Sequence, residues 1–196
     1  MKPVVLASTS SARVAILKGA GVAFEAMGSG VDEGAVKAGM RGRSPADVAA
    51  ALADAKAIAV SDRRPDAVVI GADQTLDLAG ALFDKVDDLA AARARLIELR
   101  GRMHHLHSAV AVAENGAVTW RVLESPALKM REVSDAWLDG YLARGGDDLL
   151  GSVGCYLLEG EGAQLFERIE GDYFAILGLP LLPLLAALRE RGALAA

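Results

Sequence analysis

Two carboxylates and an amine follow one apolar run near the middle of the chain. Residues 68–70 predict a buried strand that breaks at Gly71, with Asp73 just past its end. Asp77 comes next, and Lys85 follows after a short turn. Open α/β sheets bind their ligands at the carboxyl ends of buried strands, so this set indicates a ligand that is anionic or bound to a metal. The alternative is that Asp73 merely caps a turn.

A loop rich in hydroxyl groups lies near the N-terminus. Residues 3–7 predict a short buried strand, and residues 12–18 predict a helix that begins directly after the loop. The loop holds Ser8 and Ser10, and Arg13 lies in the first turn of the helix. Hydroxyls, a guanidinium and the free N–H groups of a helix start can together bind phosphate. The alternative is a serine N-cap with Arg13 on a solvated face. The Walker sequence is absent.

Two more charged positions could belong to a site. Glu33 stands beside Asp32 in a glycine-rich loop expected at 28–39. Paired acids hold hard divalent cations, although such pairs on a loop are often only solvated. Lys56 lies on an alanine-rich helix expected at 44–61, in otherwise apolar company. A lone lysine there is often a surface residue whose amine reaches water.

Three histidines lie in a predicted hairpin that turns at Asn115-Gly116. His105 and His107 would share one face of the first strand, and His104 would point to the other face. No Cys, Asp or Glu lies close by in sequence to complete a metal site. The histidines are therefore interpreted as ordinary strand residues.

The elements that must position these side chains alternate between strand and helix. Strands are expected at 3–7, 22–27, 68–70, 103–114, 117–128, within 151–158 and at 165–169, and helices at 12–18, 44–61, 87–99, 134–142 and 177–188. The pattern predicts an α/β protein. Its length of 196 residues is ample for a real core and fits one domain or two small lobes.

Composition excludes several classes of function. The net charge of −5 provides no basic field for a nucleic-acid polymer, although a few local cations can still hold one small phosphate ligand. No apolar stretch approaches the length that spans a bilayer, and the N-terminal apolar run is too short for a signal peptide. Cys155 is the single cysteine, so no internal disulfide can form and a reducing cytoplasm is expected.

Four separated motifs resemble the Maf family of nucleotide pyrophosphatases, once described as septum-formation inhibitors. They are LASTSSAR at 6–13, VDE at 31–33, GADQ at 71–74 with Lys85, and EGEGAQLFERIEGDYFAILGLPL from Glu159 onward. Their order and spacing match the family over nearly the whole chain. The resemblance implies one domain over residues 1–196, with a mixed twisted sheet flanked by helices and two lobes around a cleft (Maf or ITPase-like).

The resemblance also implies roles for particular residues. Ser8, Ser10 and Arg13 match the loop that lies on the triphosphate. The family's acidic and basic site residues are matched by Glu33, Lys56, Asp73 and Lys85, with Asp73 as the implied catalytic base. The chain departs from the family pattern at Ser11, Ala12, Asp84 and Val86. The last two flank Lys85, so the loop that carries this lysine is expected to have a different shape.

The implied activity is hydrolysis of a nucleoside triphosphate to a monophosphate and pyrophosphate. Water would be activated by Asp73, directly or through Mg²⁺ or Mn²⁺ held by Glu33 and Asp73. Gln74 and Glu159 match the branch that resembles 7-methyl-GTP pyrophosphatases, which makes 7-methyl-GTP the favoured substrate and dTTP or UTP the next. That branch usually has an aromatic residue where this chain has Ala12.

The oligomeric state and two rival functions stay open at this point. The family is commonly dimeric, so a homodimer is possible. One rival function is a nucleotide-binding regulator of cell division or septum formation that does not turn over. The second rival is a phosphatase acting on sugar phosphates, which would release orthophosphate and not pyrophosphate.

Overall fold

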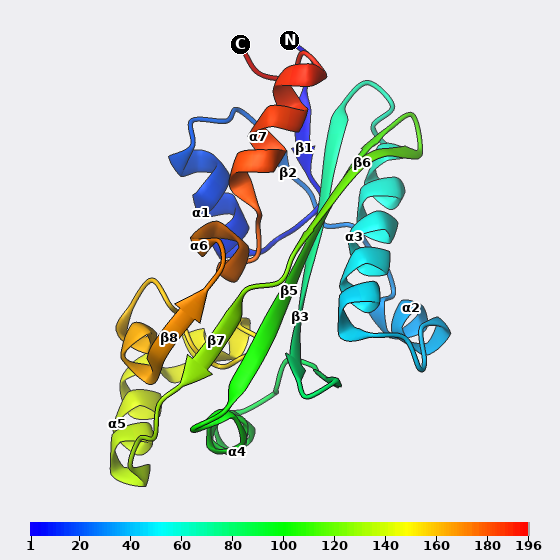
Figure 1. The fold of residues 1–196 in the computed structure, drawn as a ribbon. Coiled ribbons are helices and arrows are strands. Elements are labelled where there is room, and N and C mark those ends of the chain that lie inside the picture. The colour runs from blue at the N-terminus through cyan, green and yellow to red at the C-terminus, as the bar shows by residue number, and fades with distance from the viewer. Residues whose placement is uncertain (196) are drawn as a thin grey trace.

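The computed structural model describes residues 1–195 and shows a mixed α/β fold (Figure 1). The strands are β1 (Val4–Leu6), β2 (Glu25–Ala26), β3 (Val68–Leu78), β4 (Ala81–Phe83), β5 (Met103–Glu114), β6 (Ala117–Glu124), β7 (Ala127–Met130) and β8 (Phe166–Glu170). The helices are α1 (Ser11–Gly19), α2 (Glu33–Gly39), α3 (Pro45–Ser61), α4 (Leu89–Leu99), α5 (Asp135–Gly145), α6 (Tyr173–Ile176) and α7 (Leu181–Glu190), with 3₁₀ turns at Gly146–Gly151 and Glu161–Leu165. No helix of residues 1–195 is long and apolar enough to cross a membrane.

The two long strands β3 and β5 run the length of the molecule and are shared by two lobes (Figure 1). The first part of β3 pairs in parallel with β1, and its last part pairs with β4. In the same way, one end of β5 pairs with β7 and the other with β6. The sheet order β2-β1-β3-β5-β7-β8 mixes parallel and antiparallel neighbours. The predicted mixed sheet with two lobes is confirmed.

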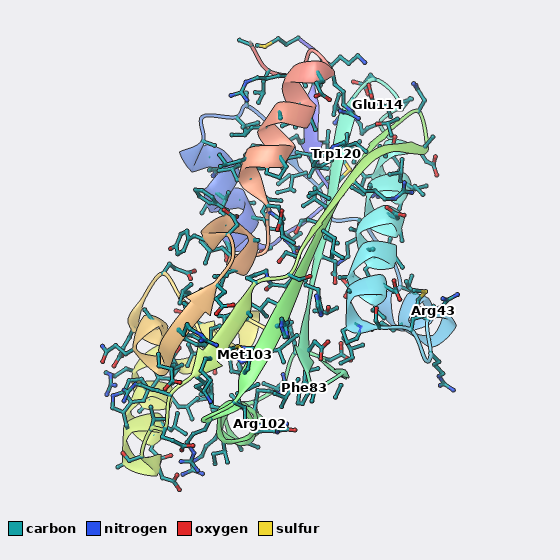
Figure 2. The ribbon with its side chains drawn as sticks, in the orientation of Figure 1. Arg43, Phe83, Arg102, Met103, Glu114 and Trp120 are labelled. Atoms are coloured by element: carbon teal, nitrogen blue, oxygen red, sulfur yellow. The ribbon has the colours of Figure 1, made fainter. Side chains whose placement is uncertain are left out.

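Each lobe has its own apolar core. One core lies where α1 and α7 cover the sheet, around Leu6, Ile70 and Leu184, and Trp120 of β6 packs against it (Figure 2). The other core lies among α4, α5 and β7, around Leu96, Leu128 and Leu138. The two ends of β3 therefore pack into different cores, and the middle of β3 lies between them.

Helix α3 lies unusually close to the sheet because both surfaces are made of small residues. Ser44 caps this helix and Pro45 occupies its first turn, as the sequence predicted. Buried alanines fill the contact, namely Ala49, Ala53 and Ala57 of the helix and Ala109, Ala111 and Ala113 of β5. At Gly71 a Cβ atom would lie 2.2 Å from the carbonyl oxygen of Ala53 and 2.5 Å from the backbone nitrogen of Ala57. The close approach brings the middle of α3 against the middle of β3.

Substituting Gly71 by alanine is therefore expected to push α3 away from the sheet. The clash is with backbone atoms, which cannot turn aside, so we expect the free energy of unfolding to fall by about 3 kcal/mol. Urea unfolding measures this loss. Gly19→Ala is the matched control, because nothing lies within 4 Å of a Cβ there. Equal stability of the two variants would contradict this account of the packing.

Several sequence-based boundaries are wrong, and the structure gives the reasons. Strand β3 does not end at Gly71 but continues to Leu78, because β5 pairs with it beyond that glycine. The region expected as one strand at 117–128 is two strands, interrupted before Pro126, and the strand expected at 22–27 is reduced to β2. Residues 151–158 form turns and no strand.

Two segments expected as loop or turn are short helices, α2 and α6. Asp32 caps α2 by accepting a hydrogen bond from the Ala35 backbone N–H, and Asp172 caps α6 by accepting from that of Ala175. The final helix begins at Leu181, later than the expected start at 177.

The histidines of β5 divide as predicted between the two faces of the strand. His105 and His107 share one face, where their rings stack at 6.2 Å. His104 is fully buried on the other face, and its Nε2 lies 2.8 Å from the hydroxyl of Tyr156. Burial lowers the pKa of His104 to about 4, so its ring is neutral at pH 7. Within residues 1–195 no three His, Cys, Asp or Glu side chains gather as a metal site.

Candidate active site

The candidate site lies where strand β3 has an open edge. Strand β1 pairs with β3 only as far as Ile70, and β4 pairs with it only from Leu76 onward. Between them, residues 71–75 have no strand partner on that edge in the part of the chain that the structure describes. A cavity of about 860 Å³ opens there, and its lining includes Asp73, Gln74 and Thr75. Successive side chains point to opposite faces of a strand, and the open edge lets both faces contribute to one cavity.

The sequence-based position of Asp73 therefore needs a correction. Asp73 lies within β3 and not past its end. The strand that ends beside the site is β1, whose last residue is Leu6. The candidate site therefore lies near the end of β1, whereas the expectation that Asp73 follows the end of its own strand is wrong.

A buried lysine bridges two carboxylates at the centre of the cavity. The amine of Lys56 lies 2.7 Å from Asp73 Oδ1 and 2.7 Å from Glu33 Oε1. Lys56 is only 7% exposed, so the alternative of a surface lysine is wrong. Helix α3 supplies the lysine because it packs closely on the sheet, and the first turn of α2 supplies Glu33. Three separate elements thus meet at one ion cluster.

Burial and charge act differently on the two acids of this cluster. Burial raises the pKa of Asp73, against the opposing effect of the nearby charges of Lys56 and Arg13. Burial also acts to raise the pKa of Glu33, but its hydrogen bond with Lys56 and the surrounding cations lower it overall. Asp73 is therefore the stronger base of the two, and Glu33 stays ionised more readily.

Arg13 is held in place by both ends of the chain. Its Nε donates to the backbone oxygen of Gly178 at 2.9 Å, and its Nη1 donates to Ser8 Oγ at 3.3 Å. The Ser8 hydroxyl also accepts a hydrogen bond from the backbone N–H of Ser10. Ser8 is buried and does not line the cavity, whereas Ser10 and Arg13 do. Ser8 thus holds the loop and the guanidinium in position.

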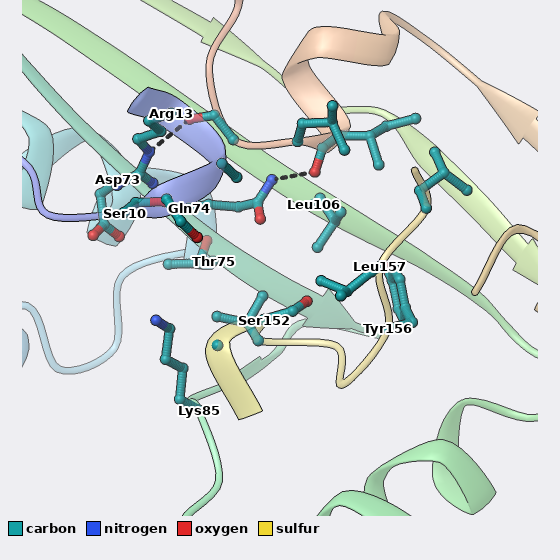
Figure 3. A pocket seen from close by; sticks show the side chains of 18 of the residues that line it. Ser10, Arg13, Asp73, Gln74, Thr75, Lys85, Leu106, Ser152, Tyr156 and Leu157 are labelled. Carbon is teal, nitrogen blue, oxygen red and sulfur yellow. Dashed lines mark hydrogen bonds between the residues drawn. The ribbon is translucent and has the colours of Figure 1, made fainter. Parts of the chain in front are cut away.

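The rim opposite Arg13 carries a second ion pair beside Lys85. Lys85 reaches into the cavity from the loop after β4 (Figure 3). Partial burial and the nearby charge of Arg13 lower the pKa of Lys85. Its neighbour Asp84 accepts a hydrogen bond from Lys37 of α2 at 2.5 Å. This contact joins α2 to the loop of Lys85, so Asp84 connects two parts of the rim.

The far end of the cavity is more apolar. Leu106, Tyr156 and Leu157 line it on the side away from Arg13 (Figure 3). Gln74 faces this end from β3, and Glu159 lies on its exposed rim. The cavity therefore has a charged half, suited to phosphate groups, and a half with apolar walls and few polar groups, suited to a flat ring.

Comparison with known proteins agrees with this arrangement. The family model described as "Maf-like protein" matches residues 3–191. The chain belongs to the Maf family. A relative from Caulobacter vibrioides, named nucleoside triphosphate pyrophosphatase, is 61% identical over 99% of this chain and 98% of its own. A relative from Rhizobium meliloti, named 7-methyl-GTP pyrophosphatase, is 51% identical over 99% of both chains.

The structure brings together nearly all of the residues that the Maf resemblance selected. The cavity is lined by Ser10, Arg13, Glu33, Lys56, Asp73, Gln74, Lys85 and Glu159. Ser8 is the exception, because it does not line the cavity and instead accepts a hydrogen bond from Arg13. Sequence reasoning missed Lys37, although it stands four residues after Glu33. Had the segment been identified as a helix, this spacing would have placed both side chains on one face.

The acids of the Maf site fit a divalent cation that is shared with a substrate. Glu33 and Asp73 each give one oxygen to Lys56, and no third acid joins them within residues 1–195. Mg²⁺ is typically held by one or two carboxylates together with substrate phosphates. The donor set therefore suits a cation that binds with a nucleotide, and not a metal held by protein ligands alone.

Proposed function

We propose that this Maf protein splits a nucleoside triphosphate between the α and β phosphates, releasing a nucleoside monophosphate and pyrophosphate. The enzyme class is confirmed by relatives 51–61% identical that are named nucleoside triphosphate pyrophosphatase. The observation that carries the proposal for this chain is the buried Asp73–Lys56–Glu33 cluster, which lies in one cavity with Arg13 and Lys85. A base and several cations in one cavity are what attack on a phosphorus atom requires.

In the proposed mechanism Asp73 takes the proton of the attacking water. Its raised pKa makes it a better proton acceptor than an ordinary aspartate. Lys56 orients the Asp73 carboxylate. Arg13 and Lys85 bind the phosphate oxygens and neutralise the negative charge that develops on the leaving pyrophosphate. Ser10 is proposed to hydrogen-bond the triphosphate, and Ser8 holds Arg13 in its orientation.

A bound Mg²⁺ or Mn²⁺ would be held by Glu33 and Asp73, where it would polarise the phosphate and lower the pKa of bound water.

We propose a single domain over residues 1–196, working in the cytoplasm where nucleotides are made, with no nucleic-acid polymer or membrane as partner. A homodimer is proposed from the family resemblance, and sedimentation would test it.

The proposed substrate is 7-methyl-GTP, with dTTP and UTP next. Gln74 and Glu159 both line the cavity, and a carboxylate suits the two N–H donors of guanine and the positive charge of a methylated ring. A relative named 7-methyl-GTP pyrophosphatase supports this choice. Ala12 weakens stacking on the ring, because it offers no aromatic face.

The test is pyrophosphate release from a panel of nucleotides with Mg²⁺ or Mn²⁺. The panel holds 7-methyl-GTP, GTP, dTTP, UTP and CTP. We expect pyrophosphate and the monophosphate in equal amounts, with the highest kcat/KM on 7-methyl-GTP. Preference for dTTP or UTP would keep the reaction and overturn the proposed substrate. Release of orthophosphate would indicate a phosphatase, and tight binding with no product would indicate a regulator without turnover.

A further inference from the structure

The side-chain amide of Gln74 is held by the C-terminal part of the chain. Its Nε2 atom lies 3.0 Å from the backbone oxygens of both Ala175 and Ile176. A third acceptor, Ser108 Oγ, lies 2.7 Å away. Figure 3 shows the amide nitrogen pointing at a backbone oxygen, away from the open part of the cavity.

The chemistry of these partners fixes which way the amide faces. Backbone carbonyls can only accept hydrogen bonds, so the atom facing them must be the donor nitrogen. Rotating the amide would place its oxygen against the oxygens of Ala175 and Ile176, leaving three acceptors with only the single proton of Ser108 to share. The Oε1 atom of Gln74 is therefore directed toward the cavity, where it can accept a hydrogen bond but cannot donate one.

Ser108 also helps to hold the Gln74 amide in this orientation. It is fully buried on β5 and is the cross-strand partner of Gln74. Its hydroxyl donates its only proton to the backbone oxygen of Ala175 at 2.5 Å. Since that proton is already used, the hydroxyl can only accept from Gln74 Nε2. Ser108 thus ties the amide and the C-terminal segment to each other.

We infer that Ser108 is a positioning residue for substrate selection, which together with the backbone oxygens of Ala175 and Ile176 holds Gln74 Oε1 as an obligate acceptor in the half of the cavity suited to the nucleobase. The site then favours a nucleobase that presents a ring or exocyclic N–H donor to this oxygen and disfavours one that presents only acceptors. The inference rests on the proposed function for the nature of the ligand. It adds the direction of the hydrogen bond and assigns a residue outside the cavity lining that helps to maintain this direction.

The test measures binding of two triphosphates that cannot be split, the α,β-methylene analogues with guanine and with unsubstituted purine. Guanine has N–H donors on its Watson–Crick edge, and unsubstituted purine has none. The dissociation constants of both are measured by calorimetry for the wild type, Gln74→Met, Ser108→Ala and Ser61→Ala. Ser61 is the matched control, since it is a fully buried serine whose hydroxyl accepts from the Gly116 backbone N–H far from the cavity.

The wild type is expected to bind the guanine analogue roughly tenfold more tightly than the purine analogue. Gln74→Met should reduce that ratio by roughly tenfold and Ser108→Ala by roughly threefold, whereas Ser61→Ala should leave it unchanged. A merely structural role for Ser108 would weaken binding of both analogues equally, and this result would overturn the inference. So would a wild-type ratio near one.

The same measurements separate this inference from the proposed function. Selective binding of the guanine analogue without pyrophosphate release from any nucleotide would overturn the proposed reaction and leave the inference standing. Pyrophosphate release with a ratio that Gln74→Met and Ser108→Ala do not change would overturn the inference alone. A folded wild type that binds neither analogue would overturn both.

Discussion

Replacing Asp73 by asparagine is expected to lower kcat for pyrophosphate release by roughly 10³-fold. Asparagine has the same size and can still accept the hydrogen bond that Lys56 donates at 2.7 Å to the aspartate. It cannot take a proton from water, and it removes one charged oxygen from the proposed cation site. The loss should therefore fall on kcat, with nucleotide affinity largely retained. Steady-state release of pyrophosphate with Mg²⁺ measures the loss.

The control for this variant is Asp77→Asn, the same substitution four residues further along β3. Asp77 Oδ1 accepts a hydrogen bond from the Gly80 backbone N–H in the turn before β4, and asparagine can do the same. We expect its kcat to match that of the wild type. If Asp73→Asn keeps more than about a tenth of wild-type kcat, a base other than Asp73 must activate the water.

Replacing Lys56 by methionine is expected to destabilise the protein by about 3 kcal/mol and to abolish measurable turnover. The methionine keeps most of the side-chain volume but leaves the buried Asp73 carboxylate facing Glu33 with no cation between them. Removing one partner of a buried ion pair costs much more than the pair itself contributes, because the remaining charge stays out of water. Urea unfolding at pH 7 gives the change in stability.

Lys37→Met is the matched comparison, since it removes the same group from the same side of the cavity. The Lys37–Asp84 pair lies at the rim, where the Asp84 side chain is 61% exposed. Such exposed pairs contribute at most about 1 kcal/mol, so this variant should lose little stability. If both lysine variants lost the same amount of stability, the burial of Lys56 would not determine how much this lysine contributes to stability.

Sequence alone predicted the type of most elements, because the local signals were strong. The Ser44-Pro45 cap, the alanine-rich helix and the Asn115-Gly116 turn each act over a few residues. The predictions of element boundaries failed where contacts between residues far apart in the sequence determine the structure. Strand β3 continues past Gly71 because β5 pairs with it from a later part of the chain. A rule that considers only the residues around Gly71 cannot identify β5 as the pairing partner.

The candidate site was predicted as a set of residues but not as an arrangement. The family motifs selected Asp73, Lys56 and Glu33, yet the alanine-rich surroundings of Lys56 allowed a solvated lysine equally well. Only the close packing of α3 at Gly71 turns that lysine inward to the carboxylates. The role of Ser108 was also invisible, since it depends on two backbone oxygens that carry no sequence signal.

The backbone oxygens of Ala175, Ile176 and Gly178 also bear on when the nucleotide cavity is completed. They orient Gln74 and Arg13, which belong to the first half of the chain. A ribosome makes the N-terminal part first, so β3 and α1 exist well before the segment that fixes their side chains. A nascent chain can thus form much of its sheet while its nucleotide cavity stays incomplete. A chain that has not yet reached residue 178 therefore lacks the hydrogen bonds that orient Gln74 and Arg13.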